Sequence, residues 1–384
     1  MKNLSVFYFF YYLGMSMYSP FLSLYFESKG FSGTATGLLL SAWAVSGVVS
    51  PLVMGMINDR LRNPLTLLRV CVVVMPVIGL GFYFSGGYAV CLALAILFSW
   101  FSSSAMPLTD SAAVQIGSRE GFSFSSVRLW GALSYAIGSF ITGFIYKETG
   151  YPVSFLIFFA MSIPILVSML RLPAVPRSSG KRPSLIEQAG TAASNRPFLL
   201  FVFMGFLLMT SMAVNSSFLP LYFREKGFDL GFVGTAYSVA ALIEVPMFGL
   251  SARLVGRFGR FPILAFAAGC YALKCFCLFA FDNMALTMAL QLLDGVSYAL
   301  FAGVAVEVVN DLSDEKSKAT SQAAFAALTY GLGGIIGNAS GGAVLEIWGG
   351  STLYLLLFGM SLCATILLIA VRKWKGFASA SPSN

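Results

Sequence analysis

Long apolar stretches recur along the whole chain and are separated by short polar connections. A hydrocarbon core about 30 Å thick needs about 20 mostly apolar residues in one α-helix. Hydropathy marks twelve segments of that kind, at 5–26, 35–57, 65–84, 88–113, 125–146, 153–172, 198–223, 232–256, 261–281, 284–308, 319–345 and 351–371. The pattern predicts an all-α membrane protein with twelve transmembrane helices.

A polar, basic stretch divides the predicted helices into two sets of six. We therefore expect four parts, which are an N-terminal six-helix bundle over 1–172, a cytoplasmic linker over 173–197, a C-terminal six-helix bundle over 198–371 and a cytoplasmic tail over 372–384.

An internal repeat supports the division into halves. The eleven residues 21–31 (FLSLYFESKGF) return 197 positions later as 218–228 (FLPLYFREKGF), with eight identities. The register persists, because Gly37 aligns with Gly234 and Arg60 with Arg257. Two parallel repeats of six helices are typical of secondary transporters, so the repeat predicts two pseudo-symmetric halves.

The amino-acid composition indicates a membrane protein and excludes several kinds of catalytic and metal site. Hydrophobic residues make up 58% of the 384 residues and charged residues only 10%, whereas a soluble domain carries about 25% charged residues. The chain has no histidine, which excludes an imidazole base and a histidine-containing zinc site. Its six cysteines lie in apolar runs, and none forms the C-x-x-C spacing of a metal or redox motif. We therefore expect no cofactor and no metal. The stretch 5–26 is too long for a signal-peptide core, and we expect an uncleaved span.

The basic residues predict the orientation, because Lys and Arg accumulate on the cytoplasmic side. With both termini inside, seventeen of the 24 basic residues face the cytoplasm and only Lys29, Lys147, Arg224 and Lys226 face the opposite side. These cytoplasmic basic residues account for the net charge of +8 and lie beside anionic lipid. The positive charge therefore does not require a nucleic-acid partner. We expect a multi-pass protein of the cytoplasmic (inner) membrane.

Local motifs add a family resemblance. Gly55 followed by Asp59 and Arg60 resembles the signature between spans 2 and 3 of the major facilitator superfamily. The segments 107–110 (PLTD) and 127–131 (VRLWG) are similar to the phenylpropionate permease subgroup, of which the lactose permease group is a more distant cousin. The resemblance implies a transporter, not an enzyme. In that subgroup span 9 usually carries an arginine and span 10 a histidine, and here Lys274 and Asp294 stand in those places.

Three charged residues fall near mid-depth in the second half, namely Glu244, Lys274 and Asp294. A charge at the centre of a bilayer costs about 2.5 to 3.5 kcal/mol on insertion scales, so each needs a reason. Two acids and one base are neutral together only if one acid is protonated, which predicts proton coupling or substrate binding at these residues. Lys274 has the alternative role of binding a substrate carboxylate. A static ion pair beside a water-exposed acid is the open structural alternative.

Other charges lie near the cytoplasmic ends of spans. We predict that Asp59, Arg60, Asp110 and Arg128 act as gating residues, with Asp110 paired to Arg128. This hypothesis rests on matching depth and on the resemblance.

Polar and aromatic residues at membrane depth are candidates for a substrate cavity. The repeat register aligns Tyr18 with Asn215. The full candidate set is Tyr18, Asn215, Gln291, Tyr298, Tyr330 and Asn338. For any single aromatic residue, packing against lipid or a neighbouring helix is the simpler interpretation.

Small residues recur every four positions in two spans. Gly333, Gly337 and Gly341 form one stripe, and Ser134, Gly138 and Thr142 form another. Such stripes allow close helix approach, and they predict tight seams that either slide or simply pack.

Together these features predict a monomeric secondary active transporter that moves a small organic solute by alternating access with proton symport. The resemblance suggests an aromatic acid, a nucleoside or a sugar-like solute. The alternative is a proton-coupled antiporter that exports drugs or metabolites. Its usual Gly and Pro near the end of span 5 are only partly matched, because Gly138 and Gly143 lack the proline. No nucleophile with a neighbouring base stands out that would indicate an enzyme.

Overall fold

The computed structural model describes the chain except residues 62, 64, 173–194, 314–316 and 372–384. The predicted tail and almost all of the predicted linker therefore lie outside the described residues, and so does the side chain of Asp59. The described part is helical, as predicted, and it contains no strand.

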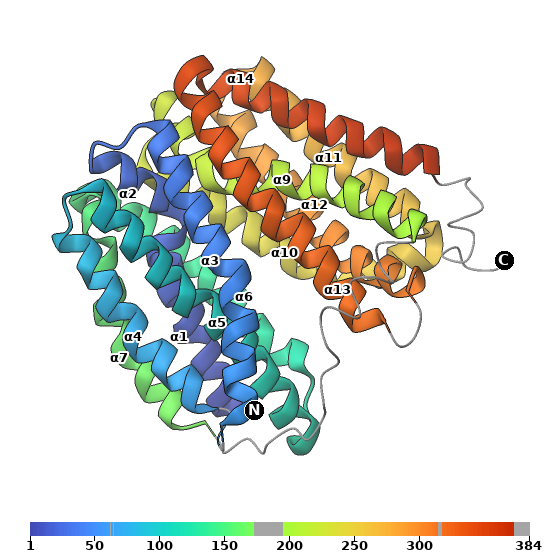
Figure 1. Cartoon of the computed structure of the whole chain (residues 1–384). Helices are drawn as coiled ribbons and strands as arrows, with labels where there is room; N and C mark the ends of the chain where they lie inside the picture. Colours follow the sequence, from blue (N-terminus) through green and yellow to red (C-terminus); the bar gives the residue numbers. More distant parts are fainter. Residues whose placement is uncertain (62, 64, 173–194, 314–316, 372–384) are drawn as a thin grey trace. The chain divides into compact units, whose positions relative to one another are not determined.

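The helices follow one another with short connections (Figure 1). Those before the linker are α1 (Lys2–Tyr18), η1 (Ser19–Phe21), α2 (Leu22–Ser28), α3 (Gly33–Arg60), α4 (Leu65–Phe84), α5 (Tyr88–Glu120), α6 (Phe124–Thr149), η2 (Tyr151–Val153) and α7 (Ser154–Leu170). Those after it are α9 (Arg196–Glu225), α10 (Leu230–Phe258), α11 (Arg260–Ala280), α12 (Met284–Asp311), α13 (Lys318–Ala326), η3 (Ala327–Leu332) and α14 (Gly333–Val371).

Ten helices of the described chain are long and apolar enough to cross a membrane. The first predicted span is not among them, because a 3-10 turn at Ser19–Phe21 interrupts it at Pro20, which has no N–H to donate. The last two predicted spans form one continuous run over Thr320–Val371. That run bends at Gly349, where φ 78° and ψ 171° leave the helical region.

Side-chain capping explains several helix starts. The Oγ of Ser32 accepts a hydrogen bond from the N–H of Ala35 at α3, and Asn283 does the same for Leu286 at α12. Asp229 accepts from the N–H of Phe232 at 2.8 Å where α10 begins. These oxygens satisfy N–H groups that have no partner within the helix.

The repeated sequence forms the same turn twice. Gly30 and Gly227, which are 197 positions apart, both have a left-handed backbone, with φ of 82° and 78°. In each copy the N–H of the next residue donates to the carbonyl five positions back, Phe31 to Phe26 and Phe228 to Phe223. Only glycine adopts this conformation without steric cost, which explains why both copies keep it.

The helices group into two compact units. The first consists of Met1–Gly180 with Pro220–Ala241, and the second of Lys181–Leu219 with Leu242–Asn384. The end of α9 and the start of α10 thus pack with the helices of the first half. The predicted division at the linker stays a prediction.

Aromatic packing and serine hydrogen bonds hold the first unit together. Phe82, Phe98 and Phe155 are fully buried and contact one another, with ring centroids 4.6 Å apart for Phe82 and Phe155. The hydroxyls of Ser46 and Ser99 donate across α3 and α5 to the carbonyls of Ile96 and Trp43. Small hydroxyl side chains let these two backbones lie close together.

The predicted small-residue stripes are confirmed as sites of close packing. In the second unit, a Cβ on Gly337 would lie 2.8 Å from Cγ2 of Val214 in α9, and one on Gly341 equally close to Cγ1 of the same valine. In the first unit, the Oγ1 of Thr142 in α6 lies 3.4 Å from the carbonyl of Ser16 in α1. There is no room at these seams for larger side chains.

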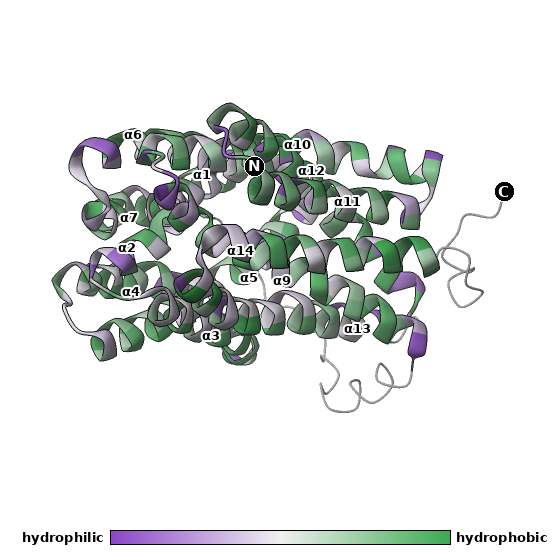
Figure 2. Ribbon diagram, turned by 90° about the horizontal axis from the view of Figure 1, so that it is seen from above, coloured by the Kyte–Doolittle hydropathy of each residue, from purple (hydrophilic) through white to green (hydrophobic). Residues whose placement is uncertain are grey.

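The distribution of hydropathy agrees with a membrane environment. Figure 2 shows hydrophobic residues along the helix bodies and the most hydrophilic positions gathered toward helix ends and connections. Apolar side chains such as Val77, Ile163 and Ile366 remain 60%, 64% and 57% exposed. Large apolar exposure of this kind indicates contact with lipid.

Candidate functional site

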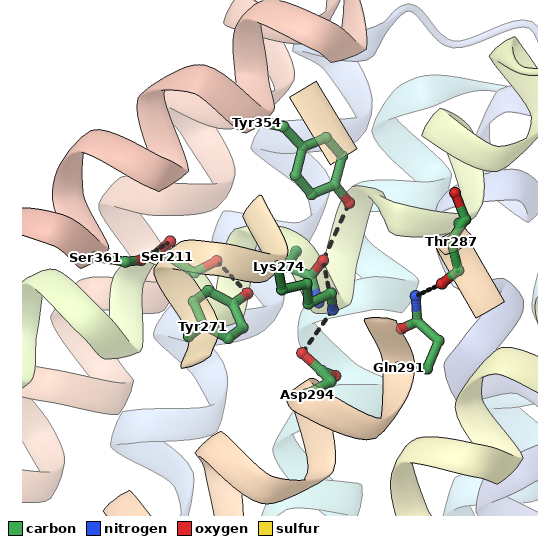
Figure 3. Close-up of polar contacts among 9 residues, drawn as sticks. Ser211, Tyr271, Lys274, Thr287, Gln291, Asp294, Tyr354 and Ser361 are labelled. Carbon is green, nitrogen blue, oxygen red and sulfur yellow. Dashed lines mark hydrogen bonds and ion pairs between the residues drawn. The ribbon is translucent and has the colours of Figure 1, made fainter. Parts of the chain in front are cut away.

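Four helices of the second unit bring polar side chains together in its apolar interior. They are α9 with Asn215, α11 with Lys274, α12 with Asp294 and α14 with Tyr354. Figure 3 shows Lys274, Asp294 and Tyr354 converging, with the dashed contacts meeting between the helices. We call these four residues the Lys274 cluster.

The ammonium of Lys274 is the centre of the cluster. Its Nζ lies 2.7 Å from Oδ1 of Asp294 and donates at 3.3 Å to Oδ1 of Asn215. The same oxygen of Asn215 accepts from the hydroxyl of Tyr354 at 3.1 Å. The ring of Tyr271 lies on another side, with its centroid 5.5 Å from Nζ.

Burial differs sharply between the two charged partners. The Lys274 side chain is 0% exposed, whereas that of Asp294 is 26% exposed. A buried charge is tolerated only when it is paired and hydrogen-bonded, and Lys274 meets both conditions. Of the two charged side chains, only Asp294 is accessible to solvent in this structure.

Further hydrogen bonds fix the orientation of Tyr271 beside the lysine. Its hydroxyl donates to the carbonyl of Ser211 at 3.3 Å, and the Oγ of Ser361 donates to the Oγ of Ser211 at 3.0 Å (Figure 3). Ser211 in turn donates to the carbonyl of Leu357 at 3.1 Å. These bonds join α9, α11 and α14, so the wall around Lys274 is built from three helices.

Lys274 and Asp294 form an ion pair in this structure, while the predicted roles of Glu244, Lys274 and Asp294 in proton coupling or substrate binding stay predictions. Glu244 lies in α10 and is half-buried. The polar partners of the lysine ammonium are Asp294 and Asn215.

The other predicted cavity residues are spread over both units. In the second unit, Gln291 is 1% exposed and donates to the carbonyl of Thr287 on its own helix, as Figure 3 shows. Tyr298 in α12 and Tyr330 in η3 are 37% and 40% exposed, and Asn338 in α14 is 6% exposed. Their roles in a cavity stay predictions.

Tyr18, the remaining predicted cavity residue, packs inside the first unit. Its ring centroid lies 5.1 Å from that of Phe98 and 5.0 Å from that of Phe158, and the side chain is 3% exposed. These contacts agree with the simpler interpretation, in which an aromatic residue packs against neighbouring helices.

The predicted pairing of Asp110 with Arg128 stays a prediction. The Oδ1 of Asp110 accepts from the hydroxyl of Tyr8 at 2.5 Å, and the guanidinium of Arg128 lies 4.3 Å from the ring centroid of Tyr12. The rings of Tyr8 and Tyr12 stack with centroids 6.1 Å apart. Two tyrosines one helical turn apart on α1 therefore contact the acid and the base, and Arg128 is close enough to Asp110 for an electrostatic interaction. Arg60 ends α3 with an exposed side chain.

The first unit has two ion pairs on its predicted outer side that were not predicted from the sequence. Arg224 at the end of α9 bonds Oε2 of Glu27 in α2 at 2.5 Å and the hydroxyl of Tyr151 at 3.2 Å. Lys147 in α6 lies 2.8 Å from Oδ2 of Asp229. We call these two ion pairs the outer latch. The signal was present in the repeat, because Glu27 and Arg224 are equivalent positions with opposite charge.

The backbones of α6 and α10 approach each other closely near the Lys147–Asp229 pair. A Cβ on Gly143 in α6 would lie 2.8 Å from the carbonyl oxygen of Leu230 and 2.9 Å from the Cα of Gly234 in α10. Outside the helices, the hydrogen bond from Lys147 lowers the pKa of the Asp229 carboxyl below its ordinary value.

The described residues contain no group of three or more histidine, cysteine, aspartate or glutamate side chains that could hold a metal ion.

Comparison with known proteins gives the family. The maltose permease of Geobacillus stearothermophilus is 28% identical over 372 residues, which cover 96% of this chain and 93% of that protein. The Escherichia coli protein named "Probable 3-phenylpropionic acid transporter" is 26% identical over 267 residues, which cover 68% of this chain and 70% of that protein. The crystal structure of the nucleoside transporter NupG superposes with a TM-score of 0.84 at 16% identity and covers 97% of this chain and 99% of that one.

The last of these likenesses shows the fold, and a family model shows the relationship. The model described as "MFS_1 like family" matches residues 1–356. The chain is therefore a multi-pass transporter of the MFS_1-like family of the major facilitator superfamily.

Proposed function

We propose that the protein is a proton symporter, a secondary transporter that moves a small organic solute across the cytoplasmic membrane by alternating access. The observation that carries this proposal is the Lys274–Asp294 pair, with one partner enclosed and the other partly exposed inside an apolar bundle. The transporter family supplies the general function.

The pair has the properties that a proton switch needs. Asp294 neutralises Lys274 at 2.7 Å, and a proton on Asp294 would cancel that pairing. Because Asp294 is 26% exposed and Lys274 is fully enclosed, the proton has access to the acid and not to the base. Loading and release of the proton would then change the charge inside the bundle, which biases the balance between two conformations. Glu244 remains the second candidate for the proton.

The outer latch supports alternating access. It joins α2 and α6 of the first sequence half to the end of α9 and the connection before α10 of the second. Broken and remade ion pairs at exposed sites cost little free energy, which suits contacts that separate once per transport cycle. We propose that the outer latch forms in one state of the transport cycle and breaks in the other, and that Asp59, Arg60, Asp110 and Arg128 act as gating residues on the opposite side.

Twelve crossings follow if the helices are grouped as the apolar segments suggest. The broken run α1, η1 and α2 counts as one crossing, and the run Thr320–Val371 counts as two that meet at Gly349. With the basic residues inside, both termini face the cytoplasm. We propose two pseudo-symmetric six-helix halves that work as a monomer.

A liposome assay tests the coupling. Purified protein is reconstituted with a pH-sensitive dye inside, and maltose, uridine and 3-phenylpropionate are added outside in turn. Symport acidifies the interior when the transported solute is added. Asp294→Asn should abolish this signal and the uphill accumulation of the solute, while solute exchange remains.

Two results would count against the proposal. Alkalinisation of the interior would indicate antiport, the alternative function. Full uphill accumulation in both Asp294→Asn and Glu244→Gln would remove proton coupling from these acids.

A further inference from the structure

The second unit carries an apolar groove whose lining includes no member of the Lys274 cluster. The groove lies between α11 and the last part of α14, has a volume of about 400 Å³, and is lined by Phe261, Pro262, Ala265, Phe266, Leu368 and Ile369. We propose that it is a phospholipid site, in which an acyl chain occupies the groove and Arg257 binds an anionic headgroup. This inference concerns a lipid and not the transported solute, so it stands or falls separately from proton coupling.

Small residues on one face of α11 leave the space for the groove. Pro262, Ala265 and Gly269 are three or four positions apart and therefore share a face of the helix. The last part of α14 packs along α11 (Figure 1). A Cβ on Gly269 would lie 3.7 Å from Cγ2 of Thr365 in α14, so the two helices are in contact at that level. Nearer the start of α11 and the end of α14, the groove takes the place of this contact.

The groove opens toward the membrane at a shallow depth. Phe261 and Leu368 are buried in it, whereas Phe266 and Ile369 are exposed at its edges. Phe266 is six positions from Arg260, where α11 starts, which is about 9 Å along the helix at about 1.5 Å per residue. In the orientation proposed above, this end of α11 is cytoplasmic. The groove therefore lies at the level where acyl chains meet the headgroups of the inner leaflet.

Hydrocarbon is the occupant that fits these walls. All the lining residues are apolar, and an apolar cavity does not hold water. An empty groove would forfeit dispersion contacts along its lining. Its volume falls within the range of ligand sites, about 300 to 1,000 Å³. An acyl chain supplies the missing contacts and reaches the groove without leaving the hydrocarbon core.

A basic residue stands beside the groove at its headgroup end. Arg257 lies in the last turn of α10 with an exposed side chain, and only two residues separate it from α11. Its guanidinium lies 5.3 Å from the ring centroid of Phe258. Arg260, which starts α11, pairs with Glu307 and Asp311. Because these acids already balance Arg260, we assign the phosphate to Arg257.

The sequence on the other side of the groove is basic as well. Arg372, Lys373 and Lys375 follow α14, which ends at Val371. Clusters of about four to eight basic residues next to a transmembrane helix favour anionic headgroups. Free phosphate would use the bases and leave the apolar groove unfilled, whereas a phospholipid uses both.

Native mass spectrometry of the full-length protein, released from detergent micelles, tests the proposal without a transport assay. The probes are phosphatidylglycerol, which is anionic, and phosphatidylcholine, which is zwitterionic, with the same two oleoyl chains. We expect one saturable phosphatidylglycerol adduct that binds at least about fivefold tighter than phosphatidylcholine, the ratio that one basic residue near an anionic lipid contributes.

Variants of α11 assign the acyl chain to the groove. Ala265→Phe fills the space and should abolish saturable binding of both lipids. Phe266→Ala removes an exposed edge, so it leaves folding intact and should weaken both lipids. Phe279→Ala, at an exposed phenylalanine of α11 outside the lining, is the matched control and should bind like the wild type.

A second pair of variants assigns the headgroup. Arg257→Gln should lower the affinity for phosphatidylglycerol about fivefold and leave that for phosphatidylcholine unchanged. Arg119→Gln, at an exposed arginine in the last turn of α5, is the control and should change neither affinity.

Four results would overturn the inference. The first two are the absence of a saturable lipid adduct and equal affinity for the two lipids. The third is unchanged lipid binding in both Ala265→Phe and Phe266→Ala. The fourth is a dimer mass that disappears in Ala265→Phe, which would assign the groove to a second copy of the chain. None of these results bears on proton movement in liposomes, and failure of the symport assay would leave the lipid site standing.

Discussion

Lys274 illustrates how one residue combines a structural cost with a functional use. Its charge lies in an apolar interior, and the ion pair with Asp294 and the bond to Asn215 make that burial tolerable. A paired buried charge adds little stability over an apolar replacement, but removal of one partner leaves the other uncompensated. Stability alone therefore does not explain the presence of this buried pair.

The residue-scale prediction is strong coupling between these two side chains. Asp294→Ala should lower the free energy of unfolding by about 3 to 5 kcal/mol, because it leaves the buried Lys274 charge unpaired. Lys274→Met should cost less, because the Asp294 carboxylate that it leaves unpaired is 26% exposed. The double variant should lose much less than the sum of the two. Unfolding in detergent micelles, analysed as a double-mutant cycle, measures the coupling. Simple additivity of the two single losses would show that the pair is not coupled.

The sequence predicted part of this site and missed the rest for a physical reason. The depth of Lys274 and Asp294 in adjacent spans indicated that they could meet, since a rise of about 1.5 Å per residue fixes position along a helix. The rotation of each helix about its axis is set by tertiary packing, so neither Tyr354 nor Tyr271 could be assigned to the cluster. The same lack of information on helix rotation explains why the hydrogen bond from Tyr8 to Asp110 was not predicted.

At the scale of elements, the glycine stripe of α14 shows how composition controls helix approach. Gly337 faces Thr210 and Val214 of α9 with contacts near 2.9 Å for an added Cβ, whereas a Cβ on Gly359 in the same helix would meet nothing within 4 Å. The spacing of four residues was sufficient to predict the seam, because residues four apart share one face of a helix.

These two glycines give a matched prediction. Gly337→Ala should lower the free energy of unfolding by about 1 to 3 kcal/mol, because the added methyl group overpacks the seam. Gly359→Ala should leave stability equal or raise it by up to about 1 kcal/mol, because alanine is the better helix former. Thermal unfolding of both variants in the same detergent measures the difference. Equal losses at both positions would contradict the assignment of the stripe to close packing.

A second element-scale prediction concerns the Lys147–Asp229 ion pair of the outer latch. The lowered pKa of Asp229 means that the pair contributes stability above the ordinary carboxyl pKa and loses it as pH falls through the lowered value. A double-mutant cycle with Lys147→Gln and Asp229→Asn should show coupling at pH 7 and none at strongly acidic pH. Asparagine keeps the acceptor that caps α10 at Phe232, so the cap is not lost with the charge. Coupling that is independent of pH would contradict this interpretation.

At the scale of the whole molecule, the repeat was the most informative part of the sequence. It predicted two equivalent turns, and Gly30 and Gly227 adopt the same left-handed conformation. It did not predict that the first copy would break at Ser19–Phe21 while α9 continues through Pro220. The prolines stand at different positions of the repeat, because Pro20 aligns with Ser217 and Pro220 with Ser23, and only the first coincides with a break in the helix.

The outer latch yields the prediction that tests the transport cycle as a whole. If the outer side must open in every cycle, a covalent link between α2 and the end of α9 should stop net transport. In a background without the six natural cysteines, Glu27→Cys and Arg224→Cys are joined with a short bifunctional thiol reagent that a reductant cleaves. Solute uptake into liposomes should fall to background after cross-linking and return after reduction. Each single cysteine treated with the same reagent is the control and should retain uptake. The reduced double variant lacks the ion pair, so its own rate shows how much the pair slows opening. Full uptake by the cross-linked protein would mean that these helices do not separate, and alternating access through the outer latch would be wrong.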